Sequence, residues 1–102
     1  MSELRTQLTK AVSLALAGDW QASHRIVQQH EDDSTACWIH AVLHRIEGDA
    51  SNARYWYRRS RREAGLAQSP QEELVTIRGT LVTRDGSRKR SGTRTAGTRA
   101  RR

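Results

Sequence analysis

Cysteine is nearly absent from this sequence of 102 residues, which contains only Cys37. A single cysteine cannot form an internal disulfide, and this favours a reducing compartment, so we expect a cytoplasmic protein. Long apolar runs are absent too, as is a basic N-terminal segment followed by an apolar stretch. These absences argue against a membrane span and a secretory signal. We therefore expect no association with membranes.

Apolar residues are scarce, at 35% of the sequence, whereas an average globular domain has roughly 45–50%. A chain of this length and composition forms one domain at most, with a small core and modest stability.

The motifs of the common enzyme classes are also missing. The sequence has no Gly-x-Ser-x-Gly elbow, no phosphate-binding loop, no dinucleotide fingerprint and no Cys-x2-Cys pair. His40 or His44 could serve as a general base only beside an oriented partner. We therefore expect neither catalytic activity nor a cofactor.

Charge is distributed unevenly along the chain. Residues 1–83 contain ten Lys and Arg and ten Asp and Glu, so the entire net charge of +7 lies in residues 84–102. That tail consists largely of Arg, Gly, Thr and Ser, and it is predicted to be disordered because it has almost nothing to bury. It is either a solubilising terminus or an arm that binds polyanions without sequence preference, since no aromatic residue separates its basic residues. Its candidate binding residues are Arg84, Arg88, Lys89, Arg90, Arg94, Arg99, Arg101 and Arg102.

The body of the chain has the apolar spacing of amphipathic helices. Apolar residues recur every three or four positions in 3–17, 20–30, 35–47 and 50–63, and these ranges are predicted helices. A fifth helix is predicted from Pro70, with Ser69 as N-cap and Glu72 at the capping-box position. Because Thr76, Gly79 and other poor helix formers weaken this last segment, a short β-hairpin is the alternative there.

Two Gly-Asp pairs, at 18–19 and 48–49, mark an internal repeat with a period of thirty residues. Glycine is favoured just after a helix and aspartate just before the next one, so each pair predicts the corner of a helical hairpin. Apolar positions coincide when the halves are overlaid, as with Leu8 and Trp38, or Val12 and Val42. Two repeats are fewer than the three usually needed for stability, so a partner or a homodimer would help.

The second unit resembles a tetratricopeptide repeat, with Gly48, Ala53, Tyr57 and Ser60 at that family's Gly, small, aromatic and small positions. Its period of thirty rather than thirty-four residues departs from the family. Residues 8–83 also resemble short bacterial proteins that carry "AGDW", "WIHA", "LHR", "EGD" and "NARYWYRR" in this order. The resemblance to the tetratricopeptide repeat implies that the chain binds a peptide or protein in a groove.

The candidate groove combines polar residues of the third and fourth predicted helices. Arg54, Arg58, Arg61 and Arg62 form a stripe that suits carboxylates or phosphates, unless it is a solvated face paired with residues 31–33 or Glu63. The predicted partner-binding residues are His40, His44, Arg54, Tyr55, Arg58 and Arg61.

Metal binding is a further alternative on the third helix. Cys37, His40, His44 and Glu47 fall within an arc of about 80°, and a His-x3-His pair on one helix can chelate zinc. Packing or lining the groove explains the same residues, and the sequence identifies no third ligand from another segment. We therefore assign no metal to them.

Together these features predict an all-α protein with two tetratricopeptide-like antiparallel helical hairpins, a fifth helix and a disordered basic C-terminal tail. The helical repeat domain spans residues 1–83 and the tail residues 84–102. The predicted function is a small protein-interaction module without catalytic activity. The alternative is a nucleic-acid or polyanion-associated protein that binds through its tail.

Overall fold

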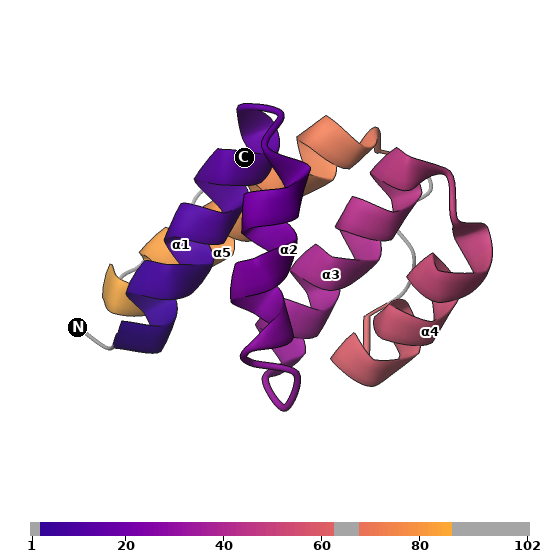
Figure 1. Ribbon diagram of the computed structural model, residues 1–102. Coiled ribbons are helices and arrows are strands. Elements are labelled where there is room, and N and C mark those ends of the chain that lie inside the picture. Colours follow the sequence, from indigo (N-terminus) through magenta and orange to yellow (C-terminus); the bar gives the residue numbers. More distant parts are fainter. Residues whose placement is uncertain (1–2, 63–67, 87–102) are drawn as a thin grey trace, which may run out of the picture.

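The computed structural model describes residues 3–62 and 68–86. Five helices follow one another along the chain: α1 (Glu3–Leu16), α2 (Trp20–Gln28), α3 (Ser34–Glu47), α4 (Ala50–Ser60) and α5 (Pro70–Gly86). The described ranges contain no strand, which confirms the predicted all-α class (Figure 1). Residues 87–102, most of the predicted tail, lie outside the described residues.

The two Gly-Asp corners have the same backbone geometry. Gly18 and Gly48 adopt left-handed φ angles of 92° and 85°, which glycine reaches without steric cost. In both corners the glycine N–H donates to the carbonyl three residues back at 3.0 Å, and the next N–H donates to the carbonyl five residues back at 2.9 Å. Asp19 and Asp49 then cap α2 and α4 by accepting from the N–H three residues on. The thirty-residue repeat is therefore a repeat of structure.

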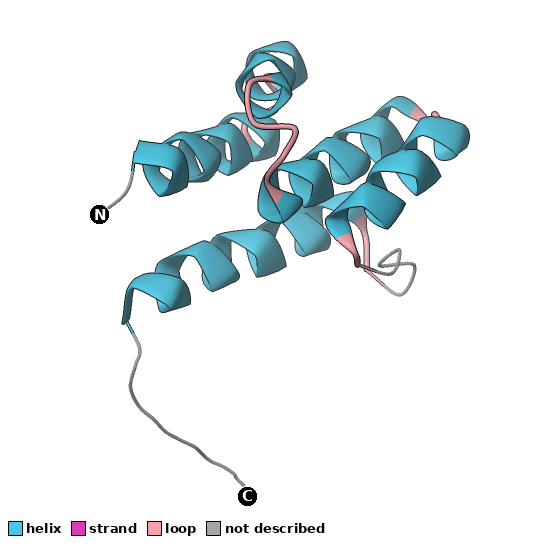
Figure 2. Ribbon diagram, turned by 90° about the horizontal axis from the view of Figure 1, so that it is seen from below, coloured by secondary structure: helices cyan, strands magenta, loops and turns pink. Residues whose placement is uncertain are grey.

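The helices pack as two hairpins with a fifth helix beneath them. α1 packs on α2 and α3 packs on α4, while α2 and α3 join the two hairpins. α5 contacts α1 and α3, and Figure 2 shows it on the side of these helices opposite to α2. α4 packs on α3, and its Tyr57 also reaches Glu73 of α5 through a hydrogen bond. The side of α4 that carries Arg54, Tyr55 and Arg58 is exposed.

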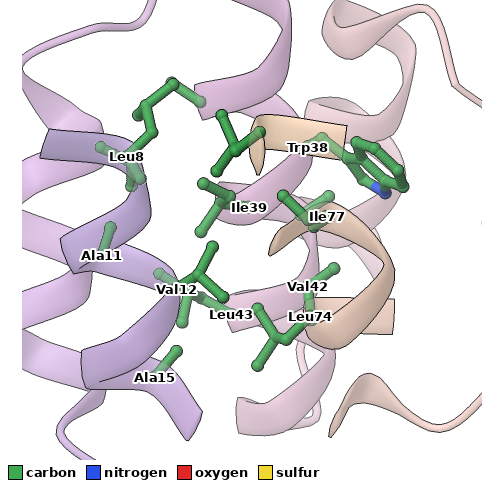
Figure 3. Packing of buried hydrophobic residues seen from close by; sticks show 14 of the residues in the cluster. Leu8, Ala11, Val12, Ala15, Trp38, Ile39, Val42, Leu43, Leu74 and Ile77 are labelled. Atoms are coloured by element: carbon green, nitrogen blue, oxygen red, sulfur yellow. The ribbon is translucent and has the colours of Figure 1, made fainter. Parts of the chain in front are cut away.

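The core lies where α1, α3 and α5 meet (Figure 3). α5 contributes Leu74, Ile77 and Leu81, whose exposed fractions are 0%, 0% and 2%. Its first turn forms the predicted capping box: the Ser69 N–H donates to Glu72 Oε1 at 2.8 Å, and the Glu72 N–H donates to Ser69 Oγ at 3.1 Å. The fifth segment is thus a helix and not a β-hairpin.

Some apolar residues of the predicted helices are not buried. Trp20 is 43% exposed and Ala50 is also exposed, because each is the first residue after its Asp cap and lies at the tip of a hairpin. Val82 is 62% exposed, since it lies about 100° around the helix from the buried Leu81.

Three predicted helix ends also differ from the structure. α2 ends at Gln28, two residues early. α4 ends at Ser60 rather than Glu63, because Arg61 turns into the left-handed region with φ 62°. α5 continues to Gly86, three residues past the predicted domain boundary at residue 83.

Among the helices of the described ranges, none combines the length and the apolar character that crossing a bilayer requires.

Candidate functional site

Three histidines from two helices meet where α2 packs on α3. His40 and His44 lie one turn apart on α3, and His24 comes from the neighbouring helix α2. One ring nitrogen from each residue lies within 4.8 Å of the others. We call His24, His40 and His44 the histidine cluster.

His40 is the centre of this cluster. Its Nε2 lies 2.8 Å from Nε2 of His24. Its ring stacks on Trp56 of α4 at a centroid distance of 3.9 Å and on His44 at 5.0 Å, whereas the His24 ring meets it edge-on at 4.6 Å. Three rings from three helices therefore enclose His40, which is only 3% exposed.

The surroundings of His40 and His24 favour their neutral forms. Burial, together with the neighbouring His24 and His44, lowers the pKa of His40 from 6.5 to about 3. The pKa of His24 is also lowered, mainly by burial and then by His44, although Glu47 and Glu31 oppose the shift. Both imidazoles are uncharged at neutral pH, so each keeps a nitrogen lone pair that can bind a metal.

The predicted set of Cys37, His40, His44 and Glu47 divides in the structure. His44 Nδ1 lies 2.9 Å from Glu47 Oε1, so this carboxylate contacts the cluster through a histidine. Cys37 instead donates from Sγ to the Glu31 carbonyl at 3.1 Å, and burial raises the pKa of its thiol. The third member of the candidate ligand set is therefore His24 and not Cys37. The sequence analysis did not identify His24.

A second candidate site is the exposed side of α4. Residues 50–62 contain five arginines and no acidic residue. Arg59 lies over the rings of Tyr55 and Trp56 and donates to the Glu31 carbonyl at 3.1 Å. Arg62 lies over Trp38, 4.2 Å from the ring centroid.

The other three arginines of this segment are exposed. Arg54, Arg58 and Arg61 form no ion pair with any residue in 3–62 or 68–86, and Tyr55 between them is 42% exposed. We call Arg54, Tyr55, Arg58 and Arg61 the basic face.

The structure thus separates the six predicted groove residues into two groups. The four members of the basic face are exposed, three of them on α4 and Arg61 directly after it. His44 is partly buried and His40 is buried, so the two histidines belong to the interior cluster rather than to an open surface.

A buried carboxylate that the sequence analysis did not single out connects α3, α4 and α5. Glu73 is 1% exposed and accepts hydrogen bonds from Trp38 Nε1, Tyr57 Oη and Arg45 Nη1 at 2.7, 2.7 and 2.6 Å. Burial, together with Glu73, raises the pKa of Tyr57 to about 12. These are the hydrogen bonds of a structural network, because every partner is a side chain of the fold itself.

Comparison of the chain with protein-family models, with curated proteins and with solved structures finds no match. The resemblance to the tetratricopeptide repeat therefore stays a prediction.

Proposed function

We propose that this protein is a small helical interaction module whose basic face binds an acidic segment of a partner protein. The observation that carries the proposal is the uncompensated charge of α4. Five arginines follow one another without an acid over residues 50–62, and Arg54, Arg58 and Arg61 are exposed and form no ion pair within residues 3–62 and 68–86. The proposal includes no catalytic step, and the single cysteine still favours the cytoplasm as its compartment.

The spacing of the arginines suits a row of carboxylates. Arg54 and Arg58 lie one turn apart on one side of α4, and Arg61 follows directly after the helix end in a left-handed conformation. A guanidinium binds a carboxylate through two parallel hydrogen bonds, and an array of three can hold an acidic strand or helix in one orientation.

The basic face also contains an aromatic residue, a feature of protein interfaces. Tyr55 is 42% exposed, and Arg59 lies over its ring at 5.9 Å. Tyrosine and arginine are the residue types that carry most binding energy at protein interfaces. Figure 1 also places the C-terminal end of α5, from which the basic tail continues, at the opposite end of the array from α4. The basic face therefore lies at a different end of the array from the last described turn of α5.

The experiment compares two double variants that lose the same charge. Arg54→Gln/Arg58→Gln removes two members of the basic face, and Arg25→Gln/Arg78→Gln removes two exposed arginines elsewhere. Each protein is titrated at low salt into a short fluorescent peptide rich in Asp and Glu. Exposed ion pairs contribute roughly 0.2–1 kcal/mol each, so the face variant should bind about three- to tenfold more weakly than the control variant.

Equal weakening in the two variants would show that binding follows net charge and would overturn the proposal. A second probe, a single-stranded oligonucleotide of equal charge, tests the alternative partner. If the oligonucleotide binds more tightly than the peptide and is lost when the chain is cut after Gly86, the tail hypothesis is favoured. The cut belongs after Gly86 because α5 extends to that residue.

A further inference from the structure

We propose that His24, His40 and His44 bind one divalent transition-metal ion, with Zn²⁺ as the ion that their geometry and chemistry fit best. The ligands come from two helices that the fold brings together, α2 and α3. The site is distinct from the basic face and does not depend on it.

The nitrogen positions are close to those of a tetrahedral site. Zinc binds histidine nitrogens at about 2.0–2.1 Å, so ligand nitrogens lie roughly 3.3 Å apart. One ring nitrogen from each histidine lies within 4.8 Å of the others, and the closest pair, Nε2 of His24 and Nε2 of His40, is 2.8 Å apart. Small rotations of the imidazole rings therefore suffice to surround an ion.

Glu47 orients one of the proposed ligands. Its Oε1 lies 2.9 Å from His44 Nδ1, so a proton on Nδ1 is donated to this carboxylate and the Nε2 lone pair is free. In zinc sites a ligating histidine usually donates its other ring N–H to a carboxylate. This hydrogen bond fixes the tautomer and raises the basicity of the ring.

Packing alone explains these histidines poorly. The thirty-residue repeat places Lys10 and Leu14 at the positions of His40 and His44, so a hairpin of this kind forms without an imidazole at either place. His40 Nδ1 is also buried without a hydrogen-bond partner in the described part of the chain. A buried imidazole with an unsatisfied nitrogen lowers the stability of the fold. Metal binding by the other ring nitrogen would offset this cost.

Three imidazole ligands also limit which metal ions can bind at this site. Imidazole nitrogens suit zinc, copper and nickel, whereas magnesium and calcium prefer oxygen. Three protein ligands leave a fourth position for water or a small anion, as in zinc sites that remain open. His24 and His44 are only partly buried, so this position can be reached from solvent.

The test measures metal affinity in the full chain after treatment with a chelator. Zn²⁺ is titrated in competition with a chromogenic chelator, and Co²⁺ is added separately because its visible absorption reports tetrahedral nitrogen ligation. We expect one ion per chain, with affinity weakened at least tenfold in His24→Gln and in His44→Gln. Glu47→Gln should weaken binding by about tenfold, since it removes only the orienting carboxylate.

His30→Gln is the matched control, because the fourth histidine of the chain lies outside the cluster. It should bind zinc as tightly as the wild type does. Circular dichroism of each variant checks that the protein is folded. His40→Gln is expected to abolish binding, but it also removes the stacked ring, so the decision rests on the two partly exposed histidines. Absence of stoichiometric binding in the wild type would overturn the proposal, as would equal loss in His24→Gln and His30→Gln.

Discussion

The first hairpin, α1 and α2, and the second, α3 and α4, share their corners but differ in their interiors. The first encloses aliphatic side chains such as Leu8, Val12 and Val27. The second encloses aromatic and polar rings at matching repeat positions, where Trp38 replaces Leu8, His44 replaces Leu14, Trp56 replaces Ile26 and Tyr57 replaces Val27. The two hairpins therefore share their corner geometry but enclose side chains of different chemical types.

The difference shows which features the hairpin itself requires. Both copies need the Gly-Asp corner and an apolar contact between their two helices, and both have them. The polar groups of the second copy instead find partners outside it: Trp38, Arg45 and Tyr57 reach Glu73 of α5, and His40 reaches His24 of α2. Polar side chains therefore connect the second hairpin to both α2 and α5.

The largest effect should follow removal of Glu73. Glu73→Ala leaves the guanidinium of Arg45 and the polar atoms of Trp38 and Tyr57 without their shared acceptor. Breaking a buried charged pair from one side costs about 3–5 kcal/mol, and the free energy of unfolding from urea titration should fall by about that amount. Glu73→Gln retains an acceptor oxygen and should lose less.

The neighbouring Glu72 supplies the control for this experiment. It is exposed and serves only the capping box of α5, so Glu72→Gln should change stability by less than about 1 kcal/mol. If Glu73→Ala and Glu72→Gln proved equally mild, the second hairpin would be as self-sufficient as the first.

A second difference between the hairpins should emerge on mild acidification of the metal-free protein. The pKa of His40 falls from 6.5 to about 3 on folding, so below pH 6.5 the unfolded chain gains a proton that the folded chain does not. Folded-state stability is therefore lost as the pH falls from about 6.5 towards 3. Between pH 7 and pH 5 the loss should be about 1–2 kcal/mol.

The measurement is urea unfolding at several pH values in the presence of a chelator. The titratable groups that face His40 are His24 from α2 and His44 from α3, whereas α4 presents the uncharged Trp56. His40→Gln should flatten the dependence on pH, and His30→Gln should leave it steep. A steep slope that survives His40→Gln would assign the effect to other groups.

The sequence predicts the local features of this fold well. The corners at Gly18 and Gly48, the cap pair Ser69 and Glu72 and the apolar stripes depend on residues a few positions apart, so their chemistry can be read locally. Helix ends are predicted less well, because the end of α4 depends on Arg61 adopting a left-handed conformation that its residue type does not favour.

The candidate sites were harder to predict because they depend on contacts between distant residues. His24 lies 16 residues before His40, and only the packing of α2 on α3 brings them together. Glu73 looks like an ordinary first-turn acid in the sequence, beside Glu72, yet it lies 35 residues from Trp38 in the chain and accepts from its indole. The repeat gives a signal only for His44, which takes the place of the aliphatic Leu14 of the first copy, and it gives none for His24 or Glu73.

The smallest effects should come from the corners, where the two hairpins are expected to respond alike. A Cβ at residue 18 or 48 would meet no atom within 4 Å, so Gly18→Ala and Gly48→Ala are strained by their φ angles of 92° and 85° alone. The left-handed conformation costs an L-residue about 1–2 kcal/mol, and each variant should lower the free energy of unfolding by that amount.

Gly79→Ala is the matched control: it lies inside α5, also in open space, and should raise stability by about 0.5–1 kcal/mol, since alanine favours a helix. A much larger loss at residue 48 than at residue 18 would mean that the corner also positions the polar interior of the second hairpin. Equal losses of stability would show that each corner forms independently of the interior of its hairpin. The side chains of α3 and α4 would then account for the differences between the hairpins.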